Sequence, residues 1–388
     1  MPLALDGEIS PRKRLIRRAV WIGYAITLII AGGFHAGKAA DDRGAFVRWR
    51  HQIHDFWKGE NIWDRYMYPN PPILPITMSP LMVLPPVAGA MVWFALKATL
   101  ACISAVLCFR MARESGQSWP AWALLAVLLL SLRPILSDLH HGNNNLIILA
   151  LVVAALYAWR QGYDVLAGLT LALAITFKVT PALFVPYFMY KRSWRTVGAT
   201  CLGVGIFLLL VPSLFLGPQF NGQCLAMWWH RILSPFIEKG ITSPQEVNQS
   251  MVGVLSRLLT EVPSADAHGN SGVQVDLNLV AWDPRHVVKF LKLISLALVG
   301  LLAVFCRTRA TRRDDPRLLG EFSLVVLTML FVSERSWKHH FVTLLLPTTY
   351  LVYRMGMAQA SKSVRWTLAG ALALSAFLMA TTSSELGA

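Results

Sequence analysis

Residues 164–190 read DVLAGLTLALAITFKVTPALFVPYFMY, and this stretch decides how the rest of the chain is arranged. It is apolar over most of its length but is interrupted by Lys178, Pro181 and Pro186. One membrane crossing by a helix needs about 20 residues, and two need about 40. The stretch therefore fits neither one straight helix nor two full crossings, and its prolines predict a break.

The composition of the whole chain is that of a membrane protein. Of its 388 residues, 55% are hydrophobic and 15% are charged, and the mean hydropathy is +0.49. An ordinary soluble domain carries about 25% charge. So little polar surface argues against a secreted enzyme, a disordered protein and a cytosolic two-domain enzyme. We expect an all-α polytopic integral membrane protein, with residues 1–388 forming a single membrane domain.

Apolar runs of membrane-helix type recur along the chain. They fall at about 19–34, 87–109, 119–136, 145–159, 196–216, 287–306, 318–333, 340–354 and 366–382. The first run follows PRKRLIRR (11–18), as in a signal peptide, but no convincing cleavage site follows it, so we interpret it as an uncleaved first helix. The sequence thus predicts about nine full transmembrane helices plus a broken or re-entrant hairpin at 164–190.

Basic clusters between these runs predict the orientation. They are RKRLIRR (12–18), RMAR (110–113), YKRSWR (190–195), RTRATRR (307–313) and SKSVR (361–365). Lys and Arg in short loops favour the cytoplasmic side, so the N-terminus is expected in the cytoplasm, and residues 35–86 and 217–286 form large extracytoplasmic loops. This scheme requires the hairpin to enter and leave on the cytoplasmic side, with Lys178 deep in the structure near its tip.

The net charge of +15 does not indicate a nucleic-acid partner here, because the basic residues sit in these short loops. The five cysteines, mostly within or beside apolar runs, have no metal-type spacing and are interpreted as small core residues. His140 and His141 are adjacent, diverge on a helix and lack a third ligand. There is no Walker loop, dinucleotide fingerprint or nucleophile elbow. We therefore expect no cofactor and assign no metal ligands, and metal dependence stays open.

Two acidic residues, Asp41 and Asp42, follow the first apolar run directly. A carboxylate at the boundary between water and lipid is well placed to act as a general base on a hydroxyl group. Helix capping or simple solvation would also explain both residues. The next acidic residues, Asp55, Glu60 and Asp64, are weaker candidates because polar loops usually contain acids.

Two further polar segments are candidates for substrate binding. The turn LSDLHHGNNNLIILAL (136–151) gathers the side chains of His140, His141, Asn143, Asn144 and Asn145. At a helix start these groups can hold a phosphate or a sugar hydroxyl, although an N-cap alone would account for the asparagines. In VNQSMVG (247–253), Asn248 interrupts a semi-apolar stretch, where sugar recognition and ordinary loop packing both remain open.

Cationic residues mark the candidate phosphate site. A charge near membrane depth, such as Lys178 in TFKVTP, costs about 3 kcal/mol and favours a functional role, with snorkelling to an interface as the alternative. The turn SERSWKHHFVTLLLP (333–347) adds Arg335, Lys338, His339 and His340. Such a density of cationic and imidazole groups suits a departing phosphate or pyrophosphate.

Taken in order, these motifs resemble those of the polytopic glycosyltransferases of family 87, which are polyprenol-phosphate-mannose-dependent mannosyltransferases of the GT-C type. The resemblance spans roughly 19–354. The motifs after the first acids are WKGENIW (57–63), YPNPP (68–72), HHGNNNLIILAL (140–151), LAGLTLALAITFKVTPAL (166–183), YKRSWR (190–195), NQS (248–250) and SWKHH (336–340).

The resemblance implies a GT-C-like fold and a multi-pass enzyme of the plasma or inner membrane. Its donor would be a hexose, mannose in this family, on a polyprenyl phosphate, and its acceptor a glycan or glycolipid. Asp41 or Asp42 would deprotonate the acceptor hydroxyl, which would attack the anomeric carbon with inversion on the extracytoplasmic side. The cationic and imidazole residues at 178 and 335–340 would hold the departing phosphate.

Three alternatives stay open. A transporter or flippase of lipid-linked sugars would also contain broken helices and buried charges, but it would have little use for the large loop 35–86. An inactive assembly protein would leave Lys178 and SWKHH without a role. Within the enzyme class, a polyprenyl-phosphate-arabinose-dependent transferase would use the same carrier lipid.

Overall fold

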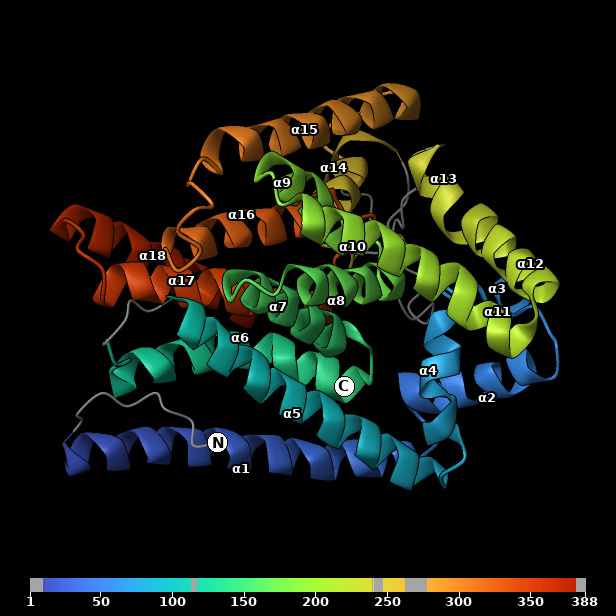
Figure 1. The fold of residues 1–388 in the computed structure, drawn as a ribbon, viewed down its shortest axis with the longest axis horizontal. Helices are drawn as coiled ribbons and strands as arrows, with labels where there is room; N and C mark the ends of the chain where they lie inside the picture. Colours follow the sequence, from blue (N-terminus) through green and yellow to red (C-terminus); the bar gives the residue numbers. More distant parts are fainter. Residues whose placement is uncertain (1–9, 113–116, 239, 241–246, 262–277, 382–388) are drawn as a thin grey trace.

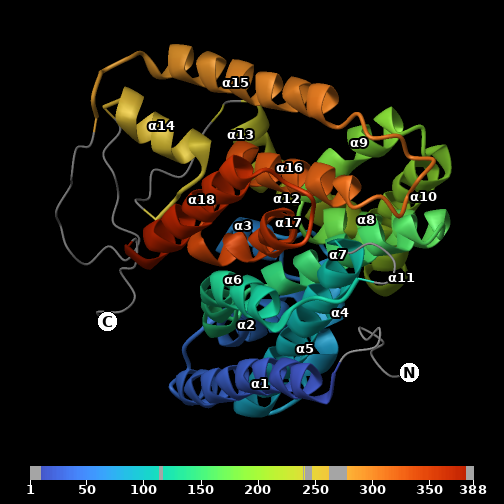
Figure 2. The same cartoon turned by 90° about the vertical axis from the view of Figure 1, so that its left-hand side faces the viewer.

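A computed structural model describes residues 10–112, 117–238, 240, 247–261 and 278–381 of the chain. Within these ranges every regular element is a helix, which confirms the expected all-α class (Figure 1). The N-terminal α1 (Pro11–Ala40) packs on α5 (Pro86–Ala112) and α6 (Ala121–His141) along one side of the molecule. On the opposite side lies α15 (Pro284–Phe305), as Figures 1 and 2 show.

Six of the described helices are long and apolar enough to cross a membrane. They are α1, α5, α6, α15, α18 (Lys362–Thr381) and the continuous helix Trp194–Leu216, which contains α10 (Trp194–Gly205), a π-turn (Ile206–Leu210) and α11 (Val211–Leu216). Each corresponds to one apolar run of the sequence.

The expected count of about nine full spans is not confirmed. The runs 145–159, 318–333 and 340–354 form shorter helices, α7 (Asn145–Arg160), α16 (Arg317–Val332) and α17 (Leu345–Gly356).

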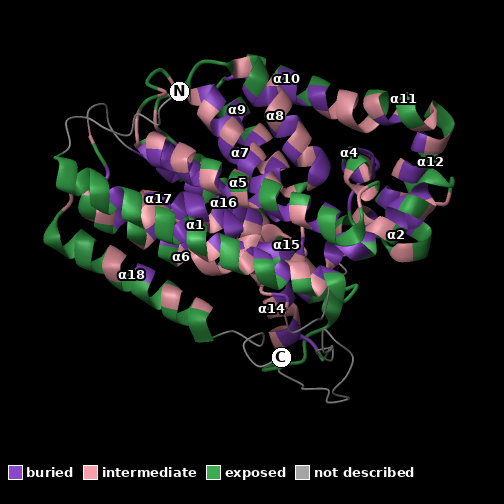
Figure 3. Ribbon diagram, turned by 90° about the horizontal axis from the view of Figure 1, so that it is seen from below, coloured by how far each residue is buried: buried purple, intermediate pink, exposed green. Residues whose placement is uncertain are grey.

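The outer helices carry apolar side chains on faces that no other part of the described chain covers (Figure 3). Only 11% of the apolar window of α15 and 6% of that of α18 is buried within the molecule. Exposed residues on these two helices include Leu293, Leu296, Phe305, Trp366 and Phe377. An apolar surface of this extent is unfavourable in water, which identifies these helices as membrane-facing.

The stretch 164–190 is broken as the sequence predicts. Helix α8 (Asp164–Phe177) ends at Lys178, whose backbone is extended with a φ of −156°, and a 3₁₀ turn (Thr180–Leu183) and α9 (Phe184–Tyr190) follow. The next helix, α10, then runs parallel to α8, since Gly168 lies against the backbone of Thr196 and Gly203 lies against Ala172 further along. The segment after Phe177 must therefore return to the level at which α8 began.

This close packing requires glycine. A Cβ atom on Gly168 would lie 2.5 Å from the carbonyl oxygen of Thr196, a distance that side chains do not adopt. At the other end of α8, the amide of Asn70 donates a 2.7 Å hydrogen bond to the carbonyl of Phe177. Asn70 belongs to the YPNPP motif, so this motif satisfies a backbone group that the helix break leaves free.

The two predicted extracytoplasmic loops are mostly helical where they are described. The first loop begins later than expected, because α1 continues to Ala40. It contains α2 (Ala45–Trp57), α3 (Ile62–Tyr66) and α4 (Ile73–Met82). The second contains α12 (Pro218–Trp228), a π-turn (Trp229–Leu233), α13 (Ser234–Ile237) and α14 (Met251–Leu259), and residues 239, 241–246 and 262–277 lie outside the described chain.

These two segments contact each other. The rings of Phe56 and Phe220 have centroids 6.2 Å apart, and the indole of Trp228 donates a 3.1 Å hydrogen bond to the carbonyl of Pro69. Through Pro69 and the neighbouring Asn70, both segments are linked to the break in the hairpin.

A buried ion pair joins the other end of the hairpin to α16. The Lys191 ammonium lies 2.6 Å from a carboxylate oxygen of Glu321, and each side chain is only 4% exposed. Glu321 also accepts hydrogen bonds from the Tyr187 hydroxyl at 2.9 Å and from the backbone N–H of Thr308 at 2.6 Å. A buried carboxylate with three donors fixes the returning chain against the α15–α16 connection.

We expect Glu321→Ala to reduce stability by about 3 kcal/mol, because it leaves the Lys191 charge buried without its partner. The double variant Lys191→Met/Glu321→Leu should lose less, since no uncompensated charge remains. Thermal unfolding in detergent, followed by tryptophan fluorescence, measures both. The control is Glu60→Gln, which removes an exposed pair with Arg65 and should leave the melting temperature unchanged. A Glu321→Ala protein that melts with the wild type would contradict the argument.

Candidate active site

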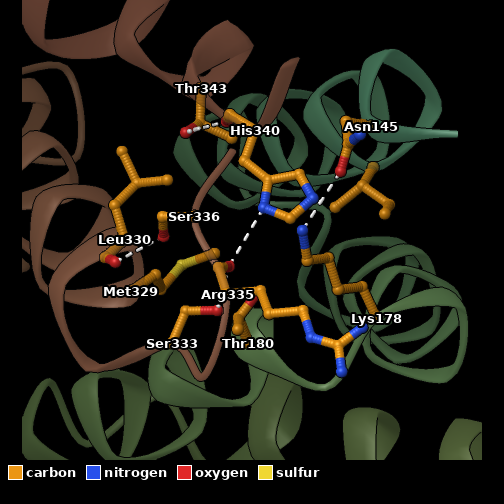
Figure 4. A pocket seen from close by; sticks show the side chains of 11 residues that line it. Asn145, Lys178, Thr180, Met329, Leu330, Ser333, Arg335, Ser336, His340 and Thr343 are labelled. Carbon is orange, nitrogen blue, oxygen red and sulfur yellow. Dashed lines mark hydrogen bonds between the residues drawn. The ribbon is translucent and has the colours of Figure 1, made fainter. Parts of the chain in front are cut away.

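Three polar turns that are distant in sequence meet around one small cavity (Figure 4). They are the α6–α7 turn, the break after α8, and the turn between α16 and the 3₁₀ helix Lys338–Leu344. The cavity has a volume of about 20 Å³, enough for one water-sized molecule. Its lining consists of Asn145, Ile148, Lys178, Thr180, Met329, Leu330, Ser333, Arg335, Ser336, His340 and Thr343.

Three of the five residues expected to bind a phosphate line this cavity together. They are Lys178, Arg335 and His340. Figure 4 shows the Lys178 ammonium between the amide of Asn145 and the ring of His340. The guanidinium of Arg335 lies 3.1 Å from the carboxylate of the neighbouring Glu334. The backbone carbonyl of Arg335 lies 3.0 Å from Nδ1 of His340. The lining thus has a cationic character and suits an anionic group.

A buried network holds Lys178 in place. Its ammonium donates a 3.1 Å hydrogen bond to Oδ1 of Asn145, whose amide NH₂ donates at 2.9 Å to Oδ1 of Asp138. The other carboxylate oxygen of Asp138 lies 3.2 Å from the ammonium of Lys97, and both of these side chains are fully buried. The carboxylate fixes the direction of the Asn145 amide, so that its oxygen faces Lys178.

Lys97 also ties the α6–α7 turn to α5. Besides the carboxylate, its ammonium donates to the carbonyls of Asp138 at 2.8 Å and Asn143 at 2.9 Å. Asn145 is one of the asparagines that the sequence predicts for ligand binding in this turn, whereas Lys97 and Asp138 were not predicted as site residues. Lys97 had a usable signal, because it is a lone charge within the apolar run 87–109. The roles of Asp138 and Asn145 depend on side chains from α5 and the α8 break.

The histidines form a ring cluster beside the cavity. His339 is buried, and its Nε2 lies 2.9 Å from the amide nitrogen of Asn143. Its ring centroid is 5.0 Å from that of His141 and 4.7 Å from that of His340. Only His340 of this cluster lines the cavity. Among the described residues, no three His, Cys, Asp or Glu side chains gather as a metal site would require.

The remaining predicted binding residues lie outside the cavity lining. Asn144 is buried in the α6–α7 turn, His140 is exposed at the end of α6, and Lys338 is partly buried at the start of its 3₁₀ helix.

Asn248 is buried and supports the 333–337 turn. Its side-chain oxygen accepts hydrogen bonds from the backbone N–H groups of Ser250 at 3.1 Å and Ser336 at 3.0 Å, and its NH₂ donates to the carbonyl of Glu334 at 2.9 Å. Its contacts thus hold the backbone on both sides of Arg335, which places it as a positioning residue for the cavity.

The two candidate bases lie on the surface at the end of α1. Asp41 pairs with Arg43 at 2.9 Å, and both side chains are mostly exposed. Asp42 is exposed and has a φ of +54°. Neither acid lines the cavity. The end of α1 is nevertheless next to the α6–α7 turn, since the ammonium of Lys38 lies 3.5 Å from the carbonyl of His140.

Comparison with known proteins assigns the class. The family model of glycosyltransferase family 87 matches residues 68–333, and the chain belongs to this family. A polyprenol-phosphate-mannose-dependent alpha-(1-2)-phosphatidylinositol mannoside mannosyltransferase of Mycolicibacterium smegmatis is 26% identical over 246 residues, which cover 61% of this chain and 49% of that protein. The protein of the same description from Mycobacterium tuberculosis is 26% identical over 238 residues, which cover 61% of this chain and 48% of that protein.

The chain thus spans about half the length of these curated relatives. No solved structure matches the chain at a significant level.

The 333–337 turn gives a pH-dependent prediction. Burial raises the pKa of Glu334 above its ordinary value of 4.5, and the charge of Arg335 only partly opposes this. The folded state therefore binds the Glu334 proton more tightly than the unfolded state, so ionisation of this group costs stability as the pH rises above 4.5. The melting temperature of the wild type should fall relative to that of Glu334→Gln over this range.

Melting temperatures of both proteins, measured from about pH 4.5 to about pH 8, provide the comparison. Asp64→Asn, which removes an exposed acid paired with Arg231, is the control for the loss of a carboxylate at the surface. A constant difference between Glu334→Gln and the wild type at all pH values would contradict the prediction.

Proposed function

We propose that this protein is a membrane glycosyltransferase. It transfers the hexose mannose from a polyprenyl-phosphate donor to a hydroxyl group of a glycan or glycolipid. The observation that carries this proposal is the cavity lined by Lys178, Arg335 and His340. Membership of glycosyltransferase family 87 supports the reaction class. The donor is inferred from the relatives, whose names describe polyprenol-phosphate-mannose-dependent enzymes.

The cavity residues would act on the leaving group. As the bond between the sugar and the phosphate breaks, negative charge grows on the phosphate oxygen, and cations fixed beside it lower the energy of the transition state. The network from Lys97 through Asp138 and Asn145 would keep the Lys178 ammonium in position without reorganisation. The cavity must open to admit a phosphate, and the exposed side chain of Arg335 is the group best able to move.

Asp41 or Asp42 would serve as the base. The acceptor oxygen attacks the anomeric carbon from the face opposite the phosphate, the carbon–oxygen bond to the phosphate breaks, and the acceptor proton passes to the carboxylate. This displacement inverts the anomeric configuration. The link between Lys38 and His140 supports the assignment, because it keeps the end of α1 next to the turn that carries Asn143 and Asn145.

We further propose that the N-terminus lies in the cytoplasm and the active site on the extracytoplasmic side of the cell membrane. The basic clusters at 110–113, 190–195 and 307–313 support this orientation. In this arrangement the short helices α7, α16 and α17 complete the set of about nine spans around the broken hairpin, and the packed segments containing α2–α4 and α12 cover the donor site from outside.

Lys178→Met should lower mannose transfer by about 10²–10³-fold, because it removes a fixed cation from the leaving phosphate. The assay uses membranes with polyprenyl-phosphate mannose and a mannosylated glycolipid acceptor. Asn145→Leu should lower transfer by less, since Lys178 remains but loses its orientation. The matched control is Lys289→Met, which removes an exposed lysine of α15. Wild-type transfer by Lys178→Met would overturn the phosphate assignment.

Replacing the catalytic acid should lower the transfer rate by about 10²–10⁴-fold and leave donor binding unchanged. Asp41→Asn and Asp42→Asn are compared in the same assay, with Asp283→Asn as a control at an exposed acid that caps α15. If both Asn variants transfer sugar at the wild-type rate, neither residue is the base. If the wild-type protein moves the donor lipid across vesicle membranes without forming product, the protein is a flippase. If product forms only from polyprenyl-phosphate arabinose, the sugar transferred is arabinose and not mannose.

A further inference from the structure

A second and much larger cavity lies at the other end of the molecule. Its volume is about 1240 Å³, and it is formed by the C-terminal ends of α5, α7 and α17 and by the start of α16. Helix α7 runs from Asn145 at the first cavity to Arg160 at the second, and α16 connects the two ends in the opposite direction. Each helix has 16 residues, so the two cavities are about 24 Å apart.

The lining of this second cavity is strongly basic. It contains five arginines and two aspartates, namely Arg110, Arg160, Arg312, Arg317, Arg354, Asp314 and Asp315. Two of the arginines have structural partners. Arg160 donates to three backbone carbonyls, of Met111, Arg313 and Asp314, and Arg317 pairs with Asp315 at 2.7 Å.

The other three arginines form no close ion pair within the described chain, although the charge of Arg312 acts on the nearby carboxylate of Asp315. The guanidinium groups of Arg110, Arg312 and Arg354 form neither an ion pair nor a hydrogen bond with a described residue. They come from α5, from the loop before α16 and from α17, so only the tertiary structure brings them together. Five arginines against two aspartates leave an excess of positive charge in one concave site, which a bound anion would offset.

The geometry favours a phosphate group as that anion. Guanidinium groups bind phosphate through paired, charge-assisted hydrogen bonds. The N-terminal end of α16, a helix of 16 residues, also faces the cavity through Pro316 and Arg317 and adds the positive end of its dipole. The phenol groups of Tyr157 and Tyr350 line the same site and can donate hydrogen bonds.

The position of the cavity favours a lipid as the source of the phosphate. The ring of Trp122, which is 48% exposed, lies against Gly356, the neighbour of the lining residue Met357. Tryptophan is enriched where the membrane meets water, which supports a position of this cavity at the depth of lipid headgroups. The nearby helix α18 presents apolar side chains such as Trp366 outward, where acyl chains would lie.

We propose that this basic cavity binds the phosphate headgroup of an anionic phospholipid in the membrane leaflet opposite the donor site. Arg110, Arg312 and Arg354 would contact the headgroup, and its acyl chains would run along the outer helices. Basic pockets between membrane helices are suited to such lipids. The lipid would stabilise the C-terminal end of α7 and the N-terminal end of α16. At their other ends, these two helices lead to Asn145 and to the 333–337 turn of the first cavity.

The test uses the full-length protein, purified in detergent and stripped of lipid. Dioleoyl phosphatidylglycerol is titrated in mixed micelles, with dioleoyl phosphatidylcholine as the lipid without net charge and inorganic phosphate as the soluble anion. Native mass spectrometry counts bound lipid, and the melting temperature reports stabilisation. The variants are Arg110→Gln, Arg354→Gln and the triple variant that adds Arg312→Gln. The matched control is Arg195→Gln, which removes an exposed arginine of another basic cluster.

Phosphatidylglycerol should bind the wild type and Arg195→Gln saturably and raise their melting temperatures. The triple variant should bind this lipid at least about tenfold more weakly. If the triple variant does not fold, the two single variants must show the weakening. Equal binding by wild type and the arginine variants would overturn the proposal. Equal binding of phosphatidylcholine, or stabilisation by inorganic phosphate alone, would also overturn it, because the ligand would then not be an anionic lipid.

Discussion

The arrangement of the molecule depends on one constraint, the break of a helix at a charged residue in the interior. A helix that ends at Phe177 leaves backbone carbonyls without partners, and Lys178 adds a charge that the interior must satisfy. Asn70 satisfies the carbonyl of Phe177, and Asn145 accepts from the Lys178 ammonium. The YPNPP segment and the α6–α7 turn are thus both required at the same point.

This constraint also connects the outer segments to the site. The turn before α4 reaches the break through Asn70, and α12 packs on that turn through Trp228. The 333–337 turn is held in a different way, by the buried side chain of Asn248. Segments from separate parts of the chain therefore meet around one cavity.

The residues expected from the sequence agree best with the lining of the cavity where a charge or a crowded polar turn stood among apolar residues. Lys178 was identified because a lysine near membrane depth is costly, and the SWKHH turn because cations and imidazoles are crowded there. The same reasoning singles out Lys97, a lone charge within the apolar run 87–109. Its polarity alone left Asn248 open between sugar recognition and loop packing, and in the structure its hydrogen bonds hold the backbone around Arg335. Local polarity cannot distinguish a contact with ligand from a contact with backbone.

By itself, the sequence determined the all-α membrane class and the break at Lys178, because hydrophobic length, proline and buried charge act locally along the chain. Only the tertiary structure decided how many helices are long enough to span the membrane and which polar groups meet. Asn145, Asp138 and Lys97 form one network, and Arg110, Arg312 and Arg354 share one cavity. Such pairings depend on how α5, α7, α16 and α17 pack side by side, and helix packing is set by side-chain shape across the whole bundle.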